Sequence, residues 1–497
     1  YADRADGTYS QVDQTHAHLN IPATFVWAKG FEARPVEISF RPPQRGWTAA
    51  TQMPAGRGRL AFTAPDLQYF MDSPVLLGDL SVREWRIGDG ASRQTVRLAV
   101  RHEGEEADID ALADKTRKIV DAQIAVFGAA PKFDYGVYTF IANYTPQASG
   151  DGMEHRNSTI LTSAAGLYES DFAQIGTLSH EFIHAWSVER LRPAELEPFD
   201  FTRANPTPSL WFAEGFTSYY GPLTIARAGV WTLDEYLAAI TGQIDAVLAA
   251  PGRRFGSPME MSLRAPFVDA ATSIDPVNTV NTFVSYYSYG AVIALALDLT
   301  LRQRFDGVTL DDYMRRLWRT HGETEEPYTH DDLREALAAI TGDSAFAETF
   351  FAQSIEGSAL PDLSPLLAQA GLALRAKNPG KASLGRGALR IDRRSGFLDA
   401  NTRIGSPLYA AGLDRGDEIV RIGRFEIASE RDYARALARA KPGETTVIRF
   451  VSRGQPREAR VAFEEDDARE VIAIEKTGEP PSAAQRAFRA AWLGAED

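Results

Sequence analysis

The sequence predicts a multidomain α+β protein in which a β-rich segment, an α-rich segment and a small segment of short strands follow one another. The chain has 497 residues, which is too long for one hydrophobic core. Apolar and polar residues alternate over Val36–Phe40 and over Val96–Val100, which is the period of half-buried strands. The spacing becomes helical over Ile109–Phe127, and Gly128 stands where a C-capping glycine belongs. Short strands and turns return after Pro379-Gly380.

These changes of pattern divide the chain into four parts. Strands are expected at 135–141 and, as the edge of a sheet, at 158–161, and long helical segments dominate from about 171 to 370. We expect an antiparallel β domain at 1–103, an α-rich domain with a small sheet at 104–376, a domain of short strands with two short helices at 377–470, and a tail at 471–497. In the tail, Ser482 predicts the start of a helix that carries Phe488 and Trp492 on one face.

The composition excludes several classes of protein. A formal net charge of -14 disfavours nucleic acid and anionic membrane surfaces as partners, because like charges repel. No stretch approaches the roughly 18 uninterrupted apolar residues of a membrane span. The chain contains no cysteine, which excludes thiolate catalysis, disulfides and cysteine-based zinc sites. The sequence begins at Tyr1 rather than at methionine, so we expect a mature periplasmic or secreted bacterial protein, with a cytoplasmic location as the alternative.

The motif His180-Glu181-Phe182-Ile183-His184 lies inside a helical pattern that runs from about 172 to 188. A separation of four residues puts both imidazoles on one helix face, where they can share one cation. Glu181 directly follows the first histidine and can take the proton of an attacking water as general base. The alternative is a solvated helix face that holds two histidines by chance, which the total of eight histidines disfavours. The motif therefore predicts one catalytic zinc per chain.

A catalytic zinc of this kind needs a third protein ligand beside an open position. We expect Glu214 to be that ligand, because an unpaired carboxylate in the aromatic helical segment Trp211–Tyr220 would be costly without a metal. A purely structural role for Glu214 is the alternative. Glu189, Glu195 and Glu197 lie nearer to the histidines, but we interpret them as members of a solvated segment that Pro193 interrupts.

His180-Glu-x-x-His184 followed by Trp211-x-x-Glu214-Gly-Phe resembles the zinc aminopeptidases of the thermolysin-like superfamily. The segment Gly152-Met153-Glu154-His155 is similar to their Gly-x-Met-Glu-Asn motif. The resemblance implies that Glu154 binds the free α-amino group of the substrate, with Gly152 and Met153 in the same substrate-binding segment. It also implies a tyrosine hydroxyl on the oxyanion from a Tyr-x-x-Gly pattern, which selects Tyr287. The alternative is that the tyrosines of this segment only cap and pack a helix start.

Two differences from the motifs of that superfamily indicate a closer resemblance to a smaller family. His155 stands where the motif has asparagine, and the separation of His184 from Glu214 is longer than in most aminopeptidases. Both departures, with His184-Ala-Trp186 and Arg190-Leu-Arg-Pro193, resemble the smaller glycyl aminopeptidase family. That family carries a C-terminal PDZ domain, and the segment from Ser406 to Ile419 is similar to the signature of bacterial PDZ domains. The resemblance thus implies a β domain, a thermolysin-like catalytic domain and a PDZ-like domain, in this order.

The leading hypothesis is a zinc aminopeptidase that hydrolyses the first peptide bond of peptides with a free N-terminus. A preference for glycine and alanine is implied by the resemblance alone. Two alternatives are a zinc endopeptidase on the same core and a PDZ-bearing binding protein with a degenerate zinc site, and the presence of Glu181 speaks against the second. A PDZ-like domain would bind a peptide C-terminus, with the loop Leu384–Gly387 as candidate cradle for the carboxylate, unless it only packs within the chain.

Overall fold

The structure is a computed structural model that describes residues 5–269, 278–386 and 396–494. Gly387, the last residue of the candidate carboxylate cradle, lies outside these ranges. The chain divides into two compact units. The first unit comprises Tyr1–Tyr236, Leu301–Glu348 and Leu493–Asp497, and the second comprises Leu237–Thr300 and Thr349–Trp492.

The first unit begins with a small antiparallel sheet in the order β1-β2-β6-β4, accompanied by the pair β3-β5. The strands are β1 (Gln11–Val12), β2 (His16–Leu19), β3 (Val36–Ser39), β4 (Thr48–Ala50), β5 (Ala61–Ala64) and β6 (Val75–Gly78), with the short helices α1 (Ile21–Thr24) and α2 (Leu67–Met71). Their core contains Leu19, Trp47, Met53, Phe70 and Leu77. This sheet confirms the predicted antiparallel β segment at the start of the chain.

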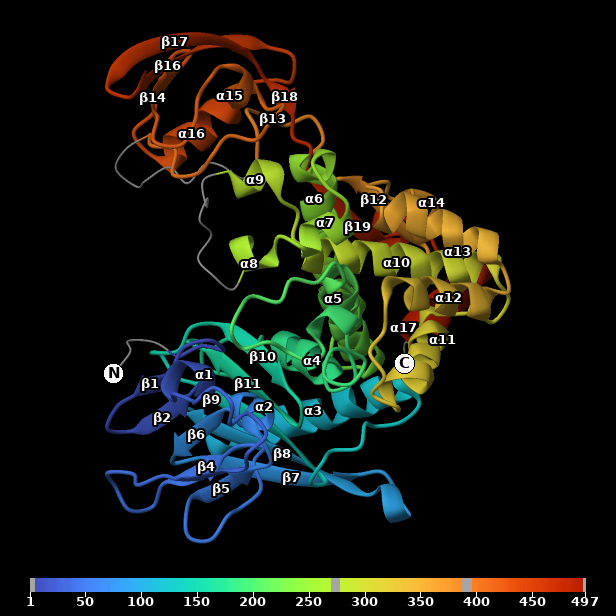
Figure 1. Cartoon of the computed structure of the whole chain (residues 1–497). Helices are drawn as coiled ribbons and strands as arrows, with labels where there is room; N and C mark the ends of the chain where they lie inside the picture. Colours follow the sequence, from blue (N-terminus) through green and yellow to red (C-terminus); the bar gives the residue numbers. More distant parts are fainter. Residues whose placement is uncertain (1–4, 270–277, 387–395, 495–497) are drawn as a thin grey trace. The chain divides into compact units, whose positions relative to one another are not determined.

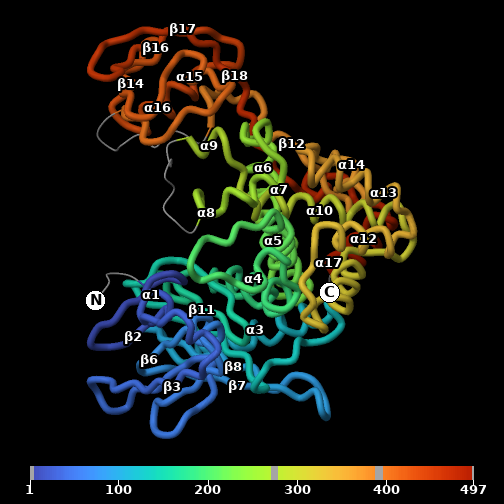
Figure 2. Tube along the Cα trace, viewed as in Figure 1, coloured from blue at the N-terminus to red at the C-terminus, as the bar shows by residue number. Residues whose placement is uncertain are grey.

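A second sheet of five strands follows in the order β10-β11-β9-β8-β7. Its strands are β7 (Ser81–Ile87), β8 (Gln94–His102), β9 (Val137–Tyr144), β10 (Asp151–His155) and β11 (Ser158–Ser163). Strands β8, β9 and β11 run parallel, and β10 is antiparallel to β11. The helix α3 (Glu106–Phe127) connects β8 to β9, as the chain trace in Figure 2 shows, and ends at Gly128 with φ of 85°.

Two sequence predictions about this sheet were wrong. The β domain was expected to extend to residue 103, but β7 and β8 pair with the later strands and join the second sheet. Segment 158–161 was expected to be an edge strand, whereas β11 lies inside the sheet and β10 forms the edge. Alternation of polar and apolar residues reveals a strand but not its neighbours, because pairing is set by contacts distant in sequence. The correction places Glu154 on the edge strand itself.

The first unit contains several further helices. They are α4 (Ile175–Ile183), α5 (Leu210–Arg227), α11 (Leu310–Leu317), α12 (His330–Thr341) and α13 (Ser344–Phe350), with a π-helical turn at Trp318–Gly322. Helix α4 contacts α3, α5, β10 and β11 (Figure 1). On the sheet, a cluster of Ala50, Leu76, Ala99, Ile141 and Ile160 joins the two sheets of this unit. The predicted α-rich middle of the chain is thereby confirmed.

The second unit combines helices with a C-terminal module. Helix α6 (Leu233–Ala249) leads into it, followed by α7 (Pro258–Ser262), α8 (Ala265–Val268), α9 (Thr279–Thr282), α10 (Tyr286–Arg304), which ends in the first unit, α14 (Leu363–Ala368) and α17 (Ala483–Leu493). Strand β12 (Leu372–Ala376) pairs with β19 (Arg469–Ala473). Thr279–Arg304 meets the length and hydropathy of a membrane span, but 78% of its apolar window is buried inside the protein. This is the character of a core helix.

The C-terminal module contains a four-stranded sheet in the order β15-β14-β16-β17. Its elements are β13 (Ala382–Ser383), α15 (Pro407–Ala410), β14 (Glu418–Ile422), β15 (Phe425–Glu426), α16 (Glu430–Leu437), β16 (Thr445–Ser452), β17 (Gln455–Ala462) and β18 (Glu464–Glu465). The core includes Leu408, Ile419, Ile448 and Phe450. Short strands with two short helices were predicted for this segment, while its PDZ-like character stays a prediction. The tail helix α17 starts after Ser482, as expected, and buries Trp492.

Candidate active site

The helix that carries the histidine motif is fixed by its neighbours. Gln123 of α3 donates from Nε2 to the carbonyl oxygen and the hydroxyl of Ser179, both at 2.8 Å. The Ser179 hydroxyl in turn donates to the carbonyl oxygen of Gly221 in α5, at 2.9 Å. Helix α4 spans Ile175–Ile183 and is therefore shorter than the predicted 172–188. His184 is its C-cap residue, so the second histidine stands where the helix ends.

Three predicted metal ligands meet in the first unit. The Nε2 atoms of His180 and His184 lie 3.1 Å apart, and Oε2 of Glu214 lies 3.2 Å from the first and 3.3 Å from the second. A tetrahedral zinc with ligand distances of about 2.0–2.1 Å holds its ligand atoms about 3.3 Å from one another. The two imidazoles and the carboxylate thus converge at the spacing that one zinc ion requires.

The tautomer of His184 also suits a ligand. Its Nδ1 donates to the carbonyl oxygen of Ser187, which leaves the lone pair of Nε2 directed to the neighbouring donors. The side chain of His184 is 1% exposed, whereas those of His180 and Glu214 are 19% and 13% exposed. The donor group is therefore largely buried, and the side chains of His180 and Glu214 remain partly accessible to solvent.

The buried carboxylates and imidazoles of the site shift one another's pKa values. Burial alone would raise the pKa of Glu214, but the imidazoles of His184 and His180 hold the pKa of this carboxyl well below its usual range. Burial alone would lower the pKa of His184, but the carboxylates of Glu214 and Glu154 raise it well above the usual value. A divalent cation would neutralise the same carboxylates without these protons, since deprotonated imidazole and carboxylate are the forms that bind metal.

Glu181, the predicted general base, is buried beside His184 and Glu154. Burial raises the pKa of this carboxyl well above its usual value. Its Oε2 atom is buried and has no hydrogen-bond partner among the described residues. A buried carboxylate oxygen without a partner is costly, so it marks a position where a water or substrate group belongs.

Gly152 explains how Glu181 fits against the sheet. A Cβ atom at Gly152 would collide with the carboxylate of Glu181 and with the methyl group of Thr177. The close approach of α4 to β10 therefore requires glycine at this point. Met153, the next residue, packs its side chain against the hydrophobic cluster that joins the two sheets. Any contact of Met153 with a substrate would have to come from its backbone.

Glu154 lies on the same face of β10 as Gly152, because successive side chains of a strand alternate. Its carboxylate belongs to a group with Glu181 and His184 whose ligand atoms all lie within 4.8 Å of one another. The structure thus brings together five predicted residues, namely Glu154, His180, Glu181, His184 and Glu214.

Tyr287, the predicted oxyanion donor, belongs to the second unit, and its role stays a prediction. It is half-buried in the first turn of α10. The hydroxyl of Tyr286 donates to Asp269, and that of Tyr289 donates to the carbonyl oxygen of Ser358 at 3.3 Å. These two tyrosines are thus engaged inside the second unit, as the packing alternative expected for part of the group.

Two residues near the site have surroundings that the sequence did not predict. Glu189 was interpreted as solvated, but burial raises its pKa to about 7. Its arginine neighbours suggested a surface segment, although Arg190 is in fact 3% exposed. His155, noted only as a departure from a motif, pairs through Nδ1 with Asp72 of the first sheet region at 2.8 Å. Burial would lower the pKa of His155, but Asp72 raises it above the usual value.

The arrangement has the chemistry of a metallopeptidase. Two neutral nitrogen donors and one carboxylate fit a catalytic zinc, which when bound would polarise a scissile carbonyl as a Lewis acid. Glu181 can accept the proton of the attacking water and pass it to the leaving amine. Glu154 can hold a cationic group beside the reacting bond.

Comparisons with known proteins agree with this chemistry. A family model described as M61 glycyl aminopeptidase matches residues 173–293, and the model of the peptidase M61 N-terminal domain matches residues 1–79. No curated protein matches. Among solved structures, an aminopeptidase N family protein from Idiomarina loihiensis has a TM-score of 0.83 at 25% identity, over 99% of this chain and 85% of that chain.

Two other solved structures are more distantly similar. An M1 zinc metallopeptidase from Deinococcus radiodurans gives a TM-score of 0.45 at 18% identity, over 71% of this chain and 72% of that chain. The yeast LTA4 hydrolase in complex with bestatin gives 0.46 at 14% identity, over 71% of this chain and 53% of that chain. The family matches and the donor set confirm the resemblance drawn from the sequence: the protein is a zinc aminopeptidase related to the M61 glycyl aminopeptidases.

Proposed function

We propose that this aminopeptidase holds the free α-amino group of its substrate on Glu154 and removes small N-terminal residues, glycine and alanine. The observation that carries the proposal is the position of Glu154. Its carboxylate stands on the edge strand β10 beside the general base Glu181 and the ligand His184, all within 4.8 Å. The size preference is supported by the glycyl aminopeptidase family that the catalytic segment matches.

The free edge of β10 can set the orientation of a bound peptide. A peptide in extended form can add to the free edge of β10 through main-chain hydrogen bonds. A carboxylate at Glu154 then pairs with the terminal ammonium and fixes the first peptide bond next to Glu181. A longer chain continuing past this point would bury Glu154 without a counter-charge, which is unfavourable. Cleavage after one residue is therefore favoured over internal cleavage.

The proposal assigns the remaining catalytic roles to residues that the sequence analysis selected. His180, His184 and Glu214 hold the zinc, Glu181 moves the proton, and Tyr287 stabilises the oxyanion of the tetrahedral intermediate. Of the three tyrosines at the start of α10, Tyr286 and Tyr289 donate to partners inside the second unit. Tyr287 is the one among them that the Tyr-x-x-Gly pattern selects.

The test is a comparison of glycine p-nitroanilide with its N-acetylated form on the wild type and Glu154→Gln. A charge-assisted hydrogen bond to a desolvated ammonium contributes about 1.5–3 kcal/mol, or roughly ten- to a hundredfold in kcat/KM. Glu154→Gln should lose at least this factor on the free amine and little on the acetylated compound. Good turnover of the acetylated compound by the wild type would favour the endopeptidase alternative. A series of alanine, leucine and arginine anilides measures the size preference.

The C-terminal module is proposed to be PDZ-like and to pack within its own unit rather than to capture peptides. Arg386, in the loop predicted as the carboxylate cradle, already pairs with Asp245 of α6 and with Asp467, both at 2.5 Å. Asn281 of the same unit donates to the carbonyl oxygen of Thr402 at 3.0 Å. Two carboxylates of the chain itself thus already pair with this guanidinium and would compete with the carboxylate of a peptide C-terminus. Export to the periplasm or the medium stays a prediction, which cell fractionation can test.

A further inference from the structure

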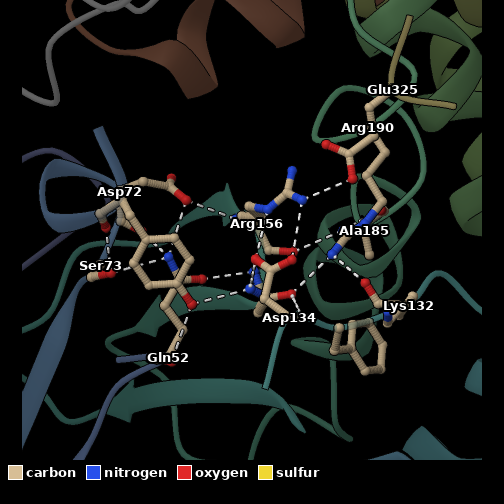
Figure 3. Close-up of polar contacts among 12 residues, drawn as sticks. Gln52, Asp72, Ser73, Lys132, Asp134, Arg156, Ala185, Arg190 and Glu325 are labelled. Atoms are coloured by element: carbon tan, nitrogen blue, oxygen red, sulfur yellow. Dashed lines mark hydrogen bonds and ion pairs between the residues drawn. The ribbon is translucent and has the colours of Figure 1, made fainter. Parts of the chain in front are cut away.

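Arg190 is a buried cation in a hydrogen-bond network that includes Arg156, Ala185 and Lys132 (Figure 3). Its Nη1 donates to the carbonyl oxygens of Ala185 and Arg156, both at 2.9 Å. Its Nη2 donates to the carbonyl oxygen of Lys132 at 3.0 Å and to Oδ1 of Asn157 at 2.9 Å. One planar group thus joins three segments that are far apart in the sequence.

Two of these segments carry active-site residues. Ala185 directly follows His184, the ligand that caps α4. Arg156 and Asn157 form the turn between β10 and β11, directly after the strand that carries Glu154. The Arg190 guanidinium therefore links the end of the ligand helix to the hairpin of the proposed amine-binding carboxylate.

The chemistry of this link depends on the shape of arginine. Each of its four contacts is to a neutral oxygen, and burial lowers the pKa of Arg190. Burying a cation without a direct carboxylate partner is costly compared with an apolar side chain of similar volume. A guanidinium, however, presents five donors in a rigid fork that reaches oxygens on several sides at once. Lysine offers a single nitrogen and cannot span the same oxygens.

The hairpin turn has a second set of supports that does not involve Arg190. Asp134 accepts from the side chain of Arg156 at 2.7 Å and from Nδ2 of Asn157 at 2.8 Å. Asp72 accepts from the backbone N–H of Arg156 at 2.9 Å, and Gln52 accepts from the backbone N–H of Asn157 at 2.7 Å (Figure 3). Without Arg190, the turn should therefore keep its own conformation. Its distance from the C-terminal end of α4, however, should no longer be fixed.

We propose that Arg190 is a positioning residue that sets the carboxylate of Glu154 against Glu181 and the metal ligands, and so determines the preference for a free N-terminus. The inference rests on the proposed function of Glu154 as the amine-binding residue. Arg190 touches neither the substrate nor the reacting atoms, so its effect is exerted through the hairpin. Its loss should appear mainly in KM for free-amine substrates and only weakly in the metal content.

The experiment compares Arg190→Lys with the wild type on glycine p-nitroanilide and its N-acetylated form. We expect kcat/KM for the free amine to fall about tenfold or more, mostly through KM, towards the loss expected for Glu154→Gln. Zinc content and activity on the acetylated compound should stay close to those of the wild type. In the double variant with Glu154→Gln, the two losses should not add, because Arg190 is proposed to act through Glu154 and coupled positions are non-additive.

Arg489→Lys is the matched control. Arg489 is also buried, at 4% exposure, and donates to the carbonyl oxygens of Ala370 and Gly371, but it also pairs with Glu475 at 2.7 Å and belongs to the second unit. It should show the general effect of removing a buried arginine on Tm and leave KM unchanged. Arg190→Gln, which adds no buried charge, replaces Arg190→Lys if that variant does not fold.

The outcomes separate this inference from the proposed function. If Glu154→Gln loses discrimination between the two substrates while Arg190→Lys and Arg190→Gln keep it, Arg190 has no positioning role. Equal losses on both substrates together with loss of zinc would make Arg190 a structural support of α4 and overturn the inference, as would failure of both variants to fold. Unchanged discrimination in Glu154→Gln would instead refute the proposed function itself.

Discussion

Replacing Gly152 with alanine should remove most of the activity while the zinc stays bound. The added Cβ would collide with the carboxylate of Glu181 and with Thr177. Overpacking of this kind costs about 1–3 kcal/mol. Glu181 is the group that should move, because no hydrogen bond from the described residues holds its Oε2 atom in place. Displacing a general base forfeits roughly 10²–10⁴ in kcat.

The assay is steady-state kinetics on glycine p-nitroanilide with zinc analysis of the same samples. Gly150→Ala is the control, since a Cβ at Gly150 meets no atom within 4 Å. Glu181→Gln sets the scale, because it keeps the shape but cannot take the proton. We expect Gly152→Ala to approach the kcat of Glu181→Gln and Gly150→Ala to match the wild type. A Gly152→Ala enzyme with wild-type kcat and a raised KM would show instead that Gly152 serves substrate binding.

Three further predictions concern other parts of the molecule. Tyr287→Phe should lower kcat about 10²-fold if one oxyanion donor is lost, with zinc content unchanged; near-wild-type kcat would transfer the role to Tyr286 or Tyr289. The pKa of His155 is raised by Asp72, so its contribution to stability is complete below its unfolded pKa of about 6.5 and is lost as the pH rises through the folded value. The free energy of unfolding measured in urea should therefore fall over that pH range more for the wild type than for His155→Gln. Equal pH slopes for the two proteins would contradict the pairing. Ending the chain after Asn378 removes the partners Arg386 and Thr402 and the strand β19, so soluble yield should collapse; a soluble and active fragment would favour a separate peptide-capturing module.

The predictions from sequence succeeded where the determinants are local. The apolar period and Gly128 place α3 within a few residues, since helix pattern and C-cap lie in one segment. The motif His180–His184 and the aromatic segment around Glu214 identify donors that the structure brings to 3.1–3.3 Å. Metal ligation imposes residue types and spacings, which explains why these positions are readable before any fold is known.

The predictions failed where contacts between distant segments decide. The helix of the motif was expected to continue to 188, because Trp186 and Val188 fit its apolar face. In the structure the indole of Trp186 donates to the carbonyl oxygen of Ala129, and Arg190 donates to that of Ala185. These contacts hold the chain outside the helix. Glu189 was expected to be solvated because its charged neighbours in the sequence suggested a surface segment. In the structure its neighbour Arg190 is buried.

The central claim is that His180, His184 and Glu214 hold a catalytic zinc. The most direct test is crystallography of the purified enzyme with anomalous scattering recorded on both sides of the zinc absorption edge. We predict one strong zinc peak per chain, bounded by Nε2 of both histidines and by the carboxylate of Glu214. Its loss in His180→Ala should coincide with loss of activity. A fully active enzyme without this peak, or with its zinc bound elsewhere, would contradict the account.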